Sequence, residues 1–161
     1  MKTSFEIKEP GLNVLPPGVE RHVINAGGLT GLQIFPDDEI EIINDEGNQI
    51  CEIIVFDKDG KSEPGILNLK ENSKNSEIKK ILSSQDESSL AANYQLKKRN
   101  LDIAKSKSSI IFSKDSKSGD KINFKSKDKC YVIFAAPGQH MLVHEQNPIT
   151  DLTIFIKRSK I

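Results

Sequence analysis

The sequence predicts a mainly β fold, an antiparallel β-barrel or sandwich that carries an insertion of one or two helices. Short segments at both ends of the chain contain alternating or continuous apolar residues, which is typical of strands. Clusters of Gly, Pro, Asn and Asp separate these segments and are expected to form turns. A polar stretch at residues 68–106 has helical spacing instead. Because 161 residues is the usual length of one domain, we expect a single β-rich domain over residues 1–161.

Composition narrows the classes of function. Hydrophobic residues make up 36% of the chain and charged residues 29%, which is apolar enough for a packed core. The 23 basic and 23 acidic residues cancel, whereas a dedicated nucleic-acid binder needs a basic surplus. No apolar run has the roughly 20 residues of a membrane helix, and the first ten residues lack the apolar run of a secretory signal. We therefore expect a cytoplasmic protein that binds neither nucleic acid nor membranes, and a homo-oligomer is compatible with the sequence.

The first sixty residues are expected to form a small antiparallel meander. Residues 1–18 contain three prolines and are predicted to be an extended lead-in, because proline cannot donate a hydrogen bond to a β-ladder. Turns at residues 27–28 and 36–38 and a hairpin loop at 44–48 would connect the strands. The predicted strands lie at residues 19–24, 29–35, 39–43 and 49–56.

The polar insertion is expected to hold two helices. A short helix is predicted at residues 77–83, with Ser76 as its N-cap. Asp86 would cap a second helix that runs to about Ser106. Its second half contains Lys97, Lys98 and Arg99, which we interpret as a solvated basic face, with contact to an anionic ligand as the alternative. The apolar face of this second helix would consist of Leu90, Tyr94, Leu101 and Ala104.

The last third of the chain returns to strands. The run at residues 130–136 is continuously apolar, as expected of a strand that is buried on both faces. Pro137 and Gly138 end this run. The other strands of this part are predicted at residues 109–113, 121–125, 141–144 and 152–157.

The densest polar cluster follows the Pro-Gly break, and we predict a binding site there. On a strand, His140 and His144 would project to one side and Glu145 to the other, because the side-chain period is two. Imidazole and carboxylate groups can form hydrogen bonds, bind a substrate or ligate a metal. The spacing matches neither HExxH nor the HxH core of the cupin metal motif, so no metal is assigned. A metal would need a third ligand from elsewhere, such as Glu52 or His22. The predicted binding residues are His140, His144, Glu145, Gln146 and Asn147.

Three further side chains lie in apolar strands. Glu52 interrupts the apolar run at 49–56, so it is either an ordinary outward-facing surface residue or a buried carboxyl that must be paired or protonated. Cys51 would point to the opposite face as a small buried thiol. Because two cysteines without a CxxC pattern do not make a disulfide framework, Cys51 and Cys130 are predicted to be free thiols. No GxSxG elbow or phosphate-binding loop occurs, and no catalytic residue is assigned.

Two stretches resemble known families. The first joins residues 21–24 to residues 37–49, which end in Glu46-Gly47-Asn48-Gln49, and it resembles the urea-carboxylase-associated family. The second covers residues 135–152 and contains the string HEQNP at residues 144–148. It looks like the end of the version of this domain found at the N-terminus of large aminomethyltransferase-like proteins. In those proteins a folate-binding domain similar to the glycine-cleavage T-protein follows.

The resemblance implies a β-rich barrel and a link to amine and one-carbon metabolism, but it carries over no catalytic residue. We expect no cofactor in this chain itself, since tetrahydrofolate would bind only to an associated domain. One hypothesis is a non-catalytic accessory or binding domain of an aminomethyltransferase system, whose partner is the folate-binding domain or a small amine. The alternative is a small stand-alone metal-binding or enzymatic β-barrel that uses residues 140–145, so whether the chain is an enzyme stays open.

Overall fold

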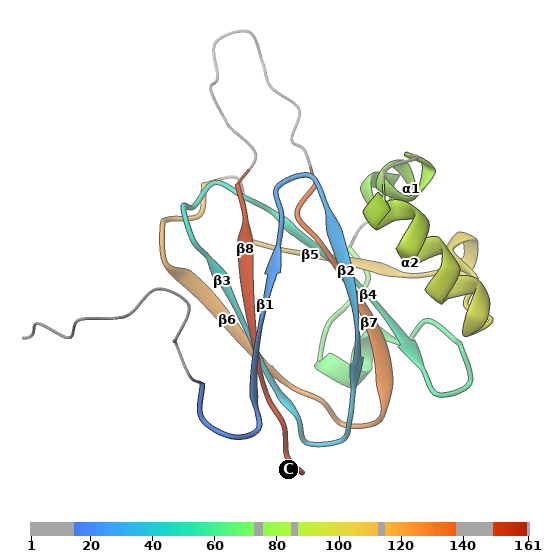
Figure 1. Ribbon diagram of the computed structural model, residues 1–161, viewed down its shortest axis with the longest axis horizontal. Helices are drawn as coiled ribbons and strands as arrows, with labels where there is room; N and C mark the ends of the chain where they lie inside the picture. The colour runs from blue at the N-terminus through green and yellow to red at the C-terminus, as the bar shows by residue number, and fades with distance from the viewer. Residues whose placement is uncertain (1–14, 73–75, 85–86, 113–114, 138–149, 161) are drawn as a thin grey trace, which may run out of the picture.

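The computed structural model describes residues 15–72, 76–84, 87–112, 115–137 and 150–160, without the side chains of Ser76 and Ser88. The eight described strands form two four-stranded antiparallel sheets, ordered β1-β8-β3-β6 and β2-β7-β4-β5 (Figure 1). The strands are β1 (Val19–Ile24), β2 (Leu29–Ile34), β3 (Glu39–Asn44), β4 (Cys51–Asp57), β5 (Ser108–Ile111), β6 (Asp120–Lys125), β7 (Cys130–Ala135) and β8 (Leu152–Lys157). The helices are η1 (Pro64–Leu67), α1 (Ser76–Ser83), α2 (Glu87–Lys98) and η2 (Ile103–Lys105).

The two sheets form a sandwich, which confirms the predicted mainly β class, and neither sheet closes into a barrel. Successive strands alternate between the sheets, except that β4 and β5 are neighbours in one sheet. This order is the double Greek key of a jelly roll. The predicted strand at residues 141–144 lies outside the described residues.

The predicted meander of the first sixty residues is wrong. β1 pairs with β8, β2 with β7, and β3 with both β6 and β8, so the first four strands do not pair with one another. The loop at residues 44–48 is therefore not a hairpin but crosses from one sheet to the other. Turn-forming residues can connect two strands of the same sheet or two strands of different sheets. Which of these connections forms depends on pairing partners that lie far away in the sequence.

The space between the two sheets is filled by apolar side chains. Ile53 and Val55 of β4 and Val132 and Phe134 of β7 point into it, and all four are fully buried. Ile40 and Ile42 of the opposite sheet meet them, as their period of two predicts. The interior of the sandwich is therefore a packed core, and a ligand site has to be sought elsewhere.

Helices α1 and α2 lie side by side over the outer face of the β2-β7-β4-β5 sheet (Figure 1). Ile78 and Leu82 of α1 and Leu96 of α2 pack there against the strands in a second apolar cluster. Strands β4 and β7 are thus covered on both faces, which explains their continuous apolar runs. The α-helices fall within the predicted insertion, and no described helix has the length and apolar content needed to cross a membrane.

The predicted course of the second helix is wrong in two respects. α2 ends at Lys98 rather than near Ser106. Its expected apolar residues Leu90 and Tyr94 are 58% and 63% exposed. The residues that face the sheet or α1 are instead Ser89, Ala92, Asn93 and Leu96.

The early end of α2 has a local cause. Asn100 adopts the left-handed conformation, with φ of 55°. The Asn100 N–H donates to the Lys97 carbonyl and the Leu101 N–H to the Leu96 carbonyl, at 3.1 and 2.9 Å. This pair of bonds is a Schellman motif, which terminates a helix and turns the chain back. Leu101 then packs into the cluster beneath the helices rather than extending a helical face.

Candidate functional site

The predicted binding residues His140, His144, Glu145, Gln146 and Asn147 all lie outside the described residues. The structure does describe what holds the two ends of their segment. Gln49 is fully buried, and its Nε2 donates to the Pro137 carbonyl at 2.9 Å and to the Ile50 carbonyl at 2.9 Å. Its Oε1 accepts from the Thr150 N–H at 3.0 Å. One amide side chain therefore joins the residues on either side of segment 138–149.

Gln49 also connects the two stretches that carry the family resemblance. It is the last residue of the first stretch, and both of its long-range partners belong to the second. In the sequence the two stretches are separate motifs, and neither of them indicates this role of Gln49. A polar residue directly before an apolar strand was the only signal in the sequence that pointed to it.

Glu52 is buried, so its interpretation as a surface residue is wrong and the buried alternative holds. Its side chain is 0% exposed and lies on the face of β4 that also carries Ile54 and Phe56. The helices cover that face, which was not evident from the sequence. Its carboxylate accepts from the Ser108 hydroxyl at 2.6 Å and from the Ile78 N–H at 3.2 Å. Ile78 belongs to the first turn of α1, whose amide groups have no partner within the helix.

The carboxyl of Glu52 has a perturbed pKa. Burial raises it, while the bonds from Ser108 and Ile78 oppose this effect only in part. The negative charge of Glu77 adds to the rise. None of the described ion pairs includes Glu52. We interpret this residue as an anchor that ties α1 to β4 rather than as a group that meets a substrate.

The two cysteines are free and buried, as predicted. Cys130 lies opposite Asp57, six residues along β4 from Cys51. At about 3.3 Å per residue the two are separated by roughly 20 Å, far beyond the reach of a disulfide. Burial raises the pKa of both thiols, that of Cys130 to about 11. Neither is a reactive thiolate at neutral pH.

An ion-pair cluster closes the end of the sandwich where β8 finishes. The Arg158 guanidinium donates two hydrogen bonds to Glu20, at 2.7 and 3.1 Å, and a third to Asp38 at 2.7 Å. Asp38 is 1% exposed and also accepts from the N–H groups of Phe35 and Ser159 at 2.9 Å each. Burial alone would raise the pKa of Asp38, but these three donors outweigh it and hold the pKa below its usual range. The cluster joins β1, β8 and the loop between β2 and β3.

No metal centre is visible in the part of the chain that the structure describes. Within it, no group of three or more His, Cys, Asp or Glu side chains could hold a metal ion. The two extra ligands considered from the sequence lie in different sheets, because His22 belongs to β1 and Glu52 to β4. His22 instead contacts Glu20, with 3.0 Å between Nε2 and Oε1.

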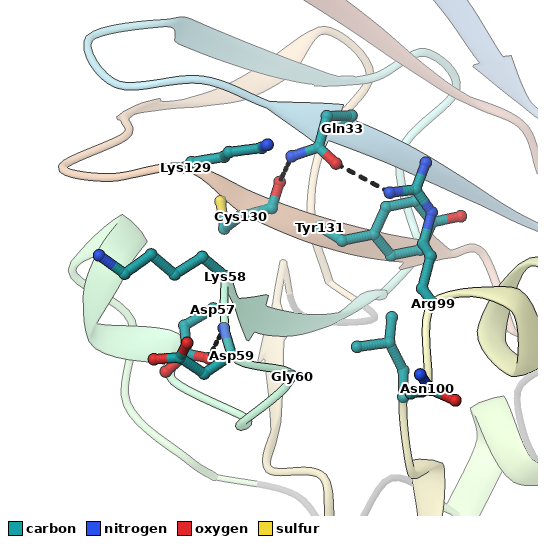
Figure 2. A pocket seen from close by; sticks show the side chains of 11 residues that line it. Gln33, Asp57, Lys58, Asp59, Gly60, Arg99, Asn100, Lys129, Cys130 and Tyr131 are labelled. Carbon is teal, nitrogen blue, oxygen red and sulfur yellow. Dashed lines mark hydrogen bonds between the residues drawn. The ribbon is translucent and has the colours of Figure 1, made fainter.

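A polar cavity of about 400 Å³ opens at the surface of the described part of the chain (Figure 2). It lies where the end of α2, the turn after β4 and the start of β7 meet. This volume falls within the usual range for small-molecule sites. Its lining includes Gln33, Asp57, Lys58, Asp59, Gly60, Arg99, Asn100, Leu101, Lys129, Cys130 and Tyr131.

Arg99 is held in place at one side of this cavity. Its guanidinium stacks on the ring of Tyr131, with 4.3 Å between its Cζ and the ring centroid. One of its amino groups donates to Gln33 Oε1 at 2.9 Å, and Gln33 Nε2 donates to the Cys130 carbonyl at 2.8 Å. Arg99 is exposed like Lys97 and Lys98, as the predicted solvated basic face requires. It also contacts Tyr131 and Gln33, which was not evident from the sequence.

Tyr131 fits under Arg99 because Gly31 lies next to it. A Cβ at position 31 would collide with the Tyr131 hydroxyl and ring. Tyr131 is therefore only 8% exposed, and burial raises the pKa of its hydroxyl, although the charge of Arg99 works against that rise. The stacked pair forms one wall of the cavity.

Comparison with known proteins gives one relative. No protein-family model matches the chain. Trimethylamine-oxide aldolase from Ruegeria pomeroyi is 32% identical to it over 153 residues, which cover 95% of this chain and 19% of the aldolase. The chain thus spans about a fifth of the length of the curated relative it matches.

This similarity supports part of the expected resemblance. It supports an association with large aminomethyltransferase-like proteins and with amine metabolism. It does not single out the urea-carboxylase-associated family or one-carbon metabolism. The chain is therefore similar, over nearly all its length, to one segment of a much longer enzyme that is named for trimethylamine N-oxide.

Proposed function

We propose that this protein is a non-catalytic accessory domain of folate-dependent aminomethyltransferase systems in amine and one-carbon metabolism. Its partner would be a folate-binding aminomethyltransferase-like domain, and tetrahydrofolate would bind there rather than in this chain. The observation that carries the proposal is the extent of the similarity, which covers 95% of this chain but 19% of the aldolase. A segment of that size in a longer enzyme needs the remainder of the enzyme as its neighbour.

The chemistry of the described residues agrees with an accessory role. The sandwich interior is filled by aliphatic side chains, both thiols are buried, and Glu52 is engaged by two donors. The acidic and basic groups of the Arg158 cluster pair with one another. These groups contribute to the stability of the domain, because each is buried or bound to a partner within the fold.

The exposed face of α2 is the candidate contact surface for the partner domain. Leu90 and Tyr94 are one helical turn apart and point away from the sheet. They are two of the four large hydrophobic side chains that the described part of the chain exposes. Exposed aromatic and aliphatic side chains of this kind are common centres of protein interfaces. The occupant we propose is the remainder of an aminomethyltransferase-like enzyme.

A segment exchange tests this proposal. The matched segment of the Ruegeria pomeroyi aldolase is replaced by this chain, and consumption of trimethylamine N-oxide is followed by proton NMR. We expect the chimera to consume the substrate and the chain alone not to consume it. A chimera in which Leu90 and Tyr94 are changed to Ser should lose at least nine-tenths of the activity or fail to assemble.

A matched control uses the exposed Lys79→Ser on α1, which should leave the chimera unchanged. Turnover by the chain alone would contradict the accessory role and favour the enzymatic alternative. That alternative also predicts a stoichiometric metal in protein purified without chelators, which elemental analysis would detect. A chimera that assembles normally but is inactive would equally contradict the proposal.

A small amine is the second expected partner. The polar cavity beside Arg99 could receive its ammonium group, since Asp57 and Asp59 line it.

A further inference from the structure

We propose that the polar cavity binds a small zwitterion, a molecule that carries an ammonium group at one end and a carboxylate at the other. This inference deepens the amine-binding part of the proposed function, because it specifies the second charge of the ligand. It uses residues other than Leu90 and Tyr94. It can therefore fail while the accessory role holds, and the reverse is also true.

The first observation is the arrangement of charge around the cavity. Asp57 ends β4 and Asp59 lies in the turn after it, whereas Arg99 follows α2 and Lys129 precedes β7. In Figure 2 the two carboxylates gather on one side, and Arg99 and Lys129 lie away from them. None of the ion pairs in the described part of the chain joins these four residues to one another. Lys58, between the two aspartates in the chain, also lines the cavity, and no described ion pair joins it to either of them. Charges of both signs thus face one cavity without forming ion pairs.

The second observation is that the cationic wall is positioned before any ligand arrives. The Arg99 guanidinium is fixed by the Tyr131 ring and by Gln33. A guanidinium has five N–H donors, and the bond to Gln33 occupies one amino group. The remaining donors can meet a carboxylate, for which this fork is well suited. Because the side chain is already ordered, binding costs less conformational entropy.

The third observation concerns the acidic wall. Asp57 Oδ1 accepts from the N–H groups of Asp59 and Lys61, both at 2.9 Å, so the turn holds this carboxylate in place. Gly60 has φ of 83°, which allows the turn to close against Asn100. A ligand with only a positive or only a negative charge would satisfy one wall and leave the other unmatched. A zwitterion satisfies both, and the 400 Å³ cavity has room for a small one.

The test measures binding of linear ω-amino acids from glycine to 6-aminohexanoate by NMR titration of the full chain at low ionic strength. The analogues with one charge are the matching alkylamines and alkanoates. We expect at least one amino acid to bind tenfold tighter than both of its singly charged analogues. Raising the salt concentration should weaken this binding, because the walls are open to solvent.

Variants locate the site. Arg99→Gln and Asp59→Asn should each weaken the best amino acid at least tenfold, whereas Lys121→Gln on the exposed strand β6 should leave it unchanged. Thermal unfolding of each variant checks that the fold is kept, and Lys129→Gln replaces Arg99→Gln if the latter loses stability. Equal binding of zwitterions and singly charged analogues would overturn the proposal. So would variants that bind as the unmodified protein does.

Discussion

Replacing the buried Glu52 by Gln should change how stability depends on pH. The carboxyl is 0% exposed, and burial raises its pKa above that of the unfolded chain. At a pH between these two pKa values the folded state holds a proton that the unfolded state has released. Folding is then favoured by low pH, and the stability that Glu52 contributes is lost as the pH rises through the raised pKa. The amide side chain of the Glu52→Gln variant cannot ionise, so the stability of the variant does not fall in this way as the pH rises.

The size of this pH dependence is set by the single proton that the Glu52 carboxyl binds. Within that window the difference in unfolding free energy between the two proteins changes by at most about 1.4 kcal/mol per pH unit. We expect the stability of Glu52→Gln relative to the unmodified protein to rise with pH, beginning near the pKa of an unfolded glutamate, about 4.3, and ending at the raised pKa of Glu52. Each kcal/mol gained would raise the melting temperature by roughly 2–4 °C. The other carboxyls with shifted pKa values, Glu20 and Asp38, are present in both proteins and cancel in the comparison.

Urea unfolding of both proteins at pH 5, 6.5 and 8 measures this difference, with the exposed Glu46→Gln as the matched control. The control should show no such trend. A difference that is independent of pH would refute the reasoning. A difference that falls with rising pH would mean that the Glu52 carboxylate is stabilised by a positive charge and not penalised by burial.

Three further outcomes are expected. Arg158→Ala should destabilise the fold by about 2–4 kcal/mol, because it leaves the buried Asp38 without its cation, and denaturant titration will measure this. Gln49→Ala should cost about 2–4 kcal/mol by the same measurement, because it removes two buried hydrogen bonds and one partly buried one; a loss below about 0.5 kcal/mol would contradict the bridging role. Cys51 and Cys130 should react with a thiol reagent within minutes only after denaturation, giving two free thiols.

The second helix shows where local reasoning fails. Leu90, Tyr94 and Leu101 have helical spacing. This spacing predicts neither the residue at which the helix ends nor the face of the helix that packs against the sheet. Asn100 ends α2 by adopting a left-handed conformation that the next residues stabilise. Ser89, a polar residue, occupies the buried side because its hydroxyl donates to the Ile81 carbonyl of α1 at 2.6 Å. Such a bond exists only after the two helices have packed.

The sequence alone determined the described strands and the buried character of one of them. Alternation predicted the inward side of β3, and the unbroken apolar run of β7 predicted a strand that is covered on both faces, because the hydrophobicity of each residue reflects its burial. Only the tertiary structure decided which strands pair, because an apolar face fits several partners equally well. It also decided the polar contacts, since Arg158 meets Asp38 across 120 residues, Gln49 meets Thr150 across 101, and Arg99 meets Gln33 across 66. Contacts between residues so far apart produce no periodic pattern in the sequence. They stabilise the protein only after folding has brought the residues together.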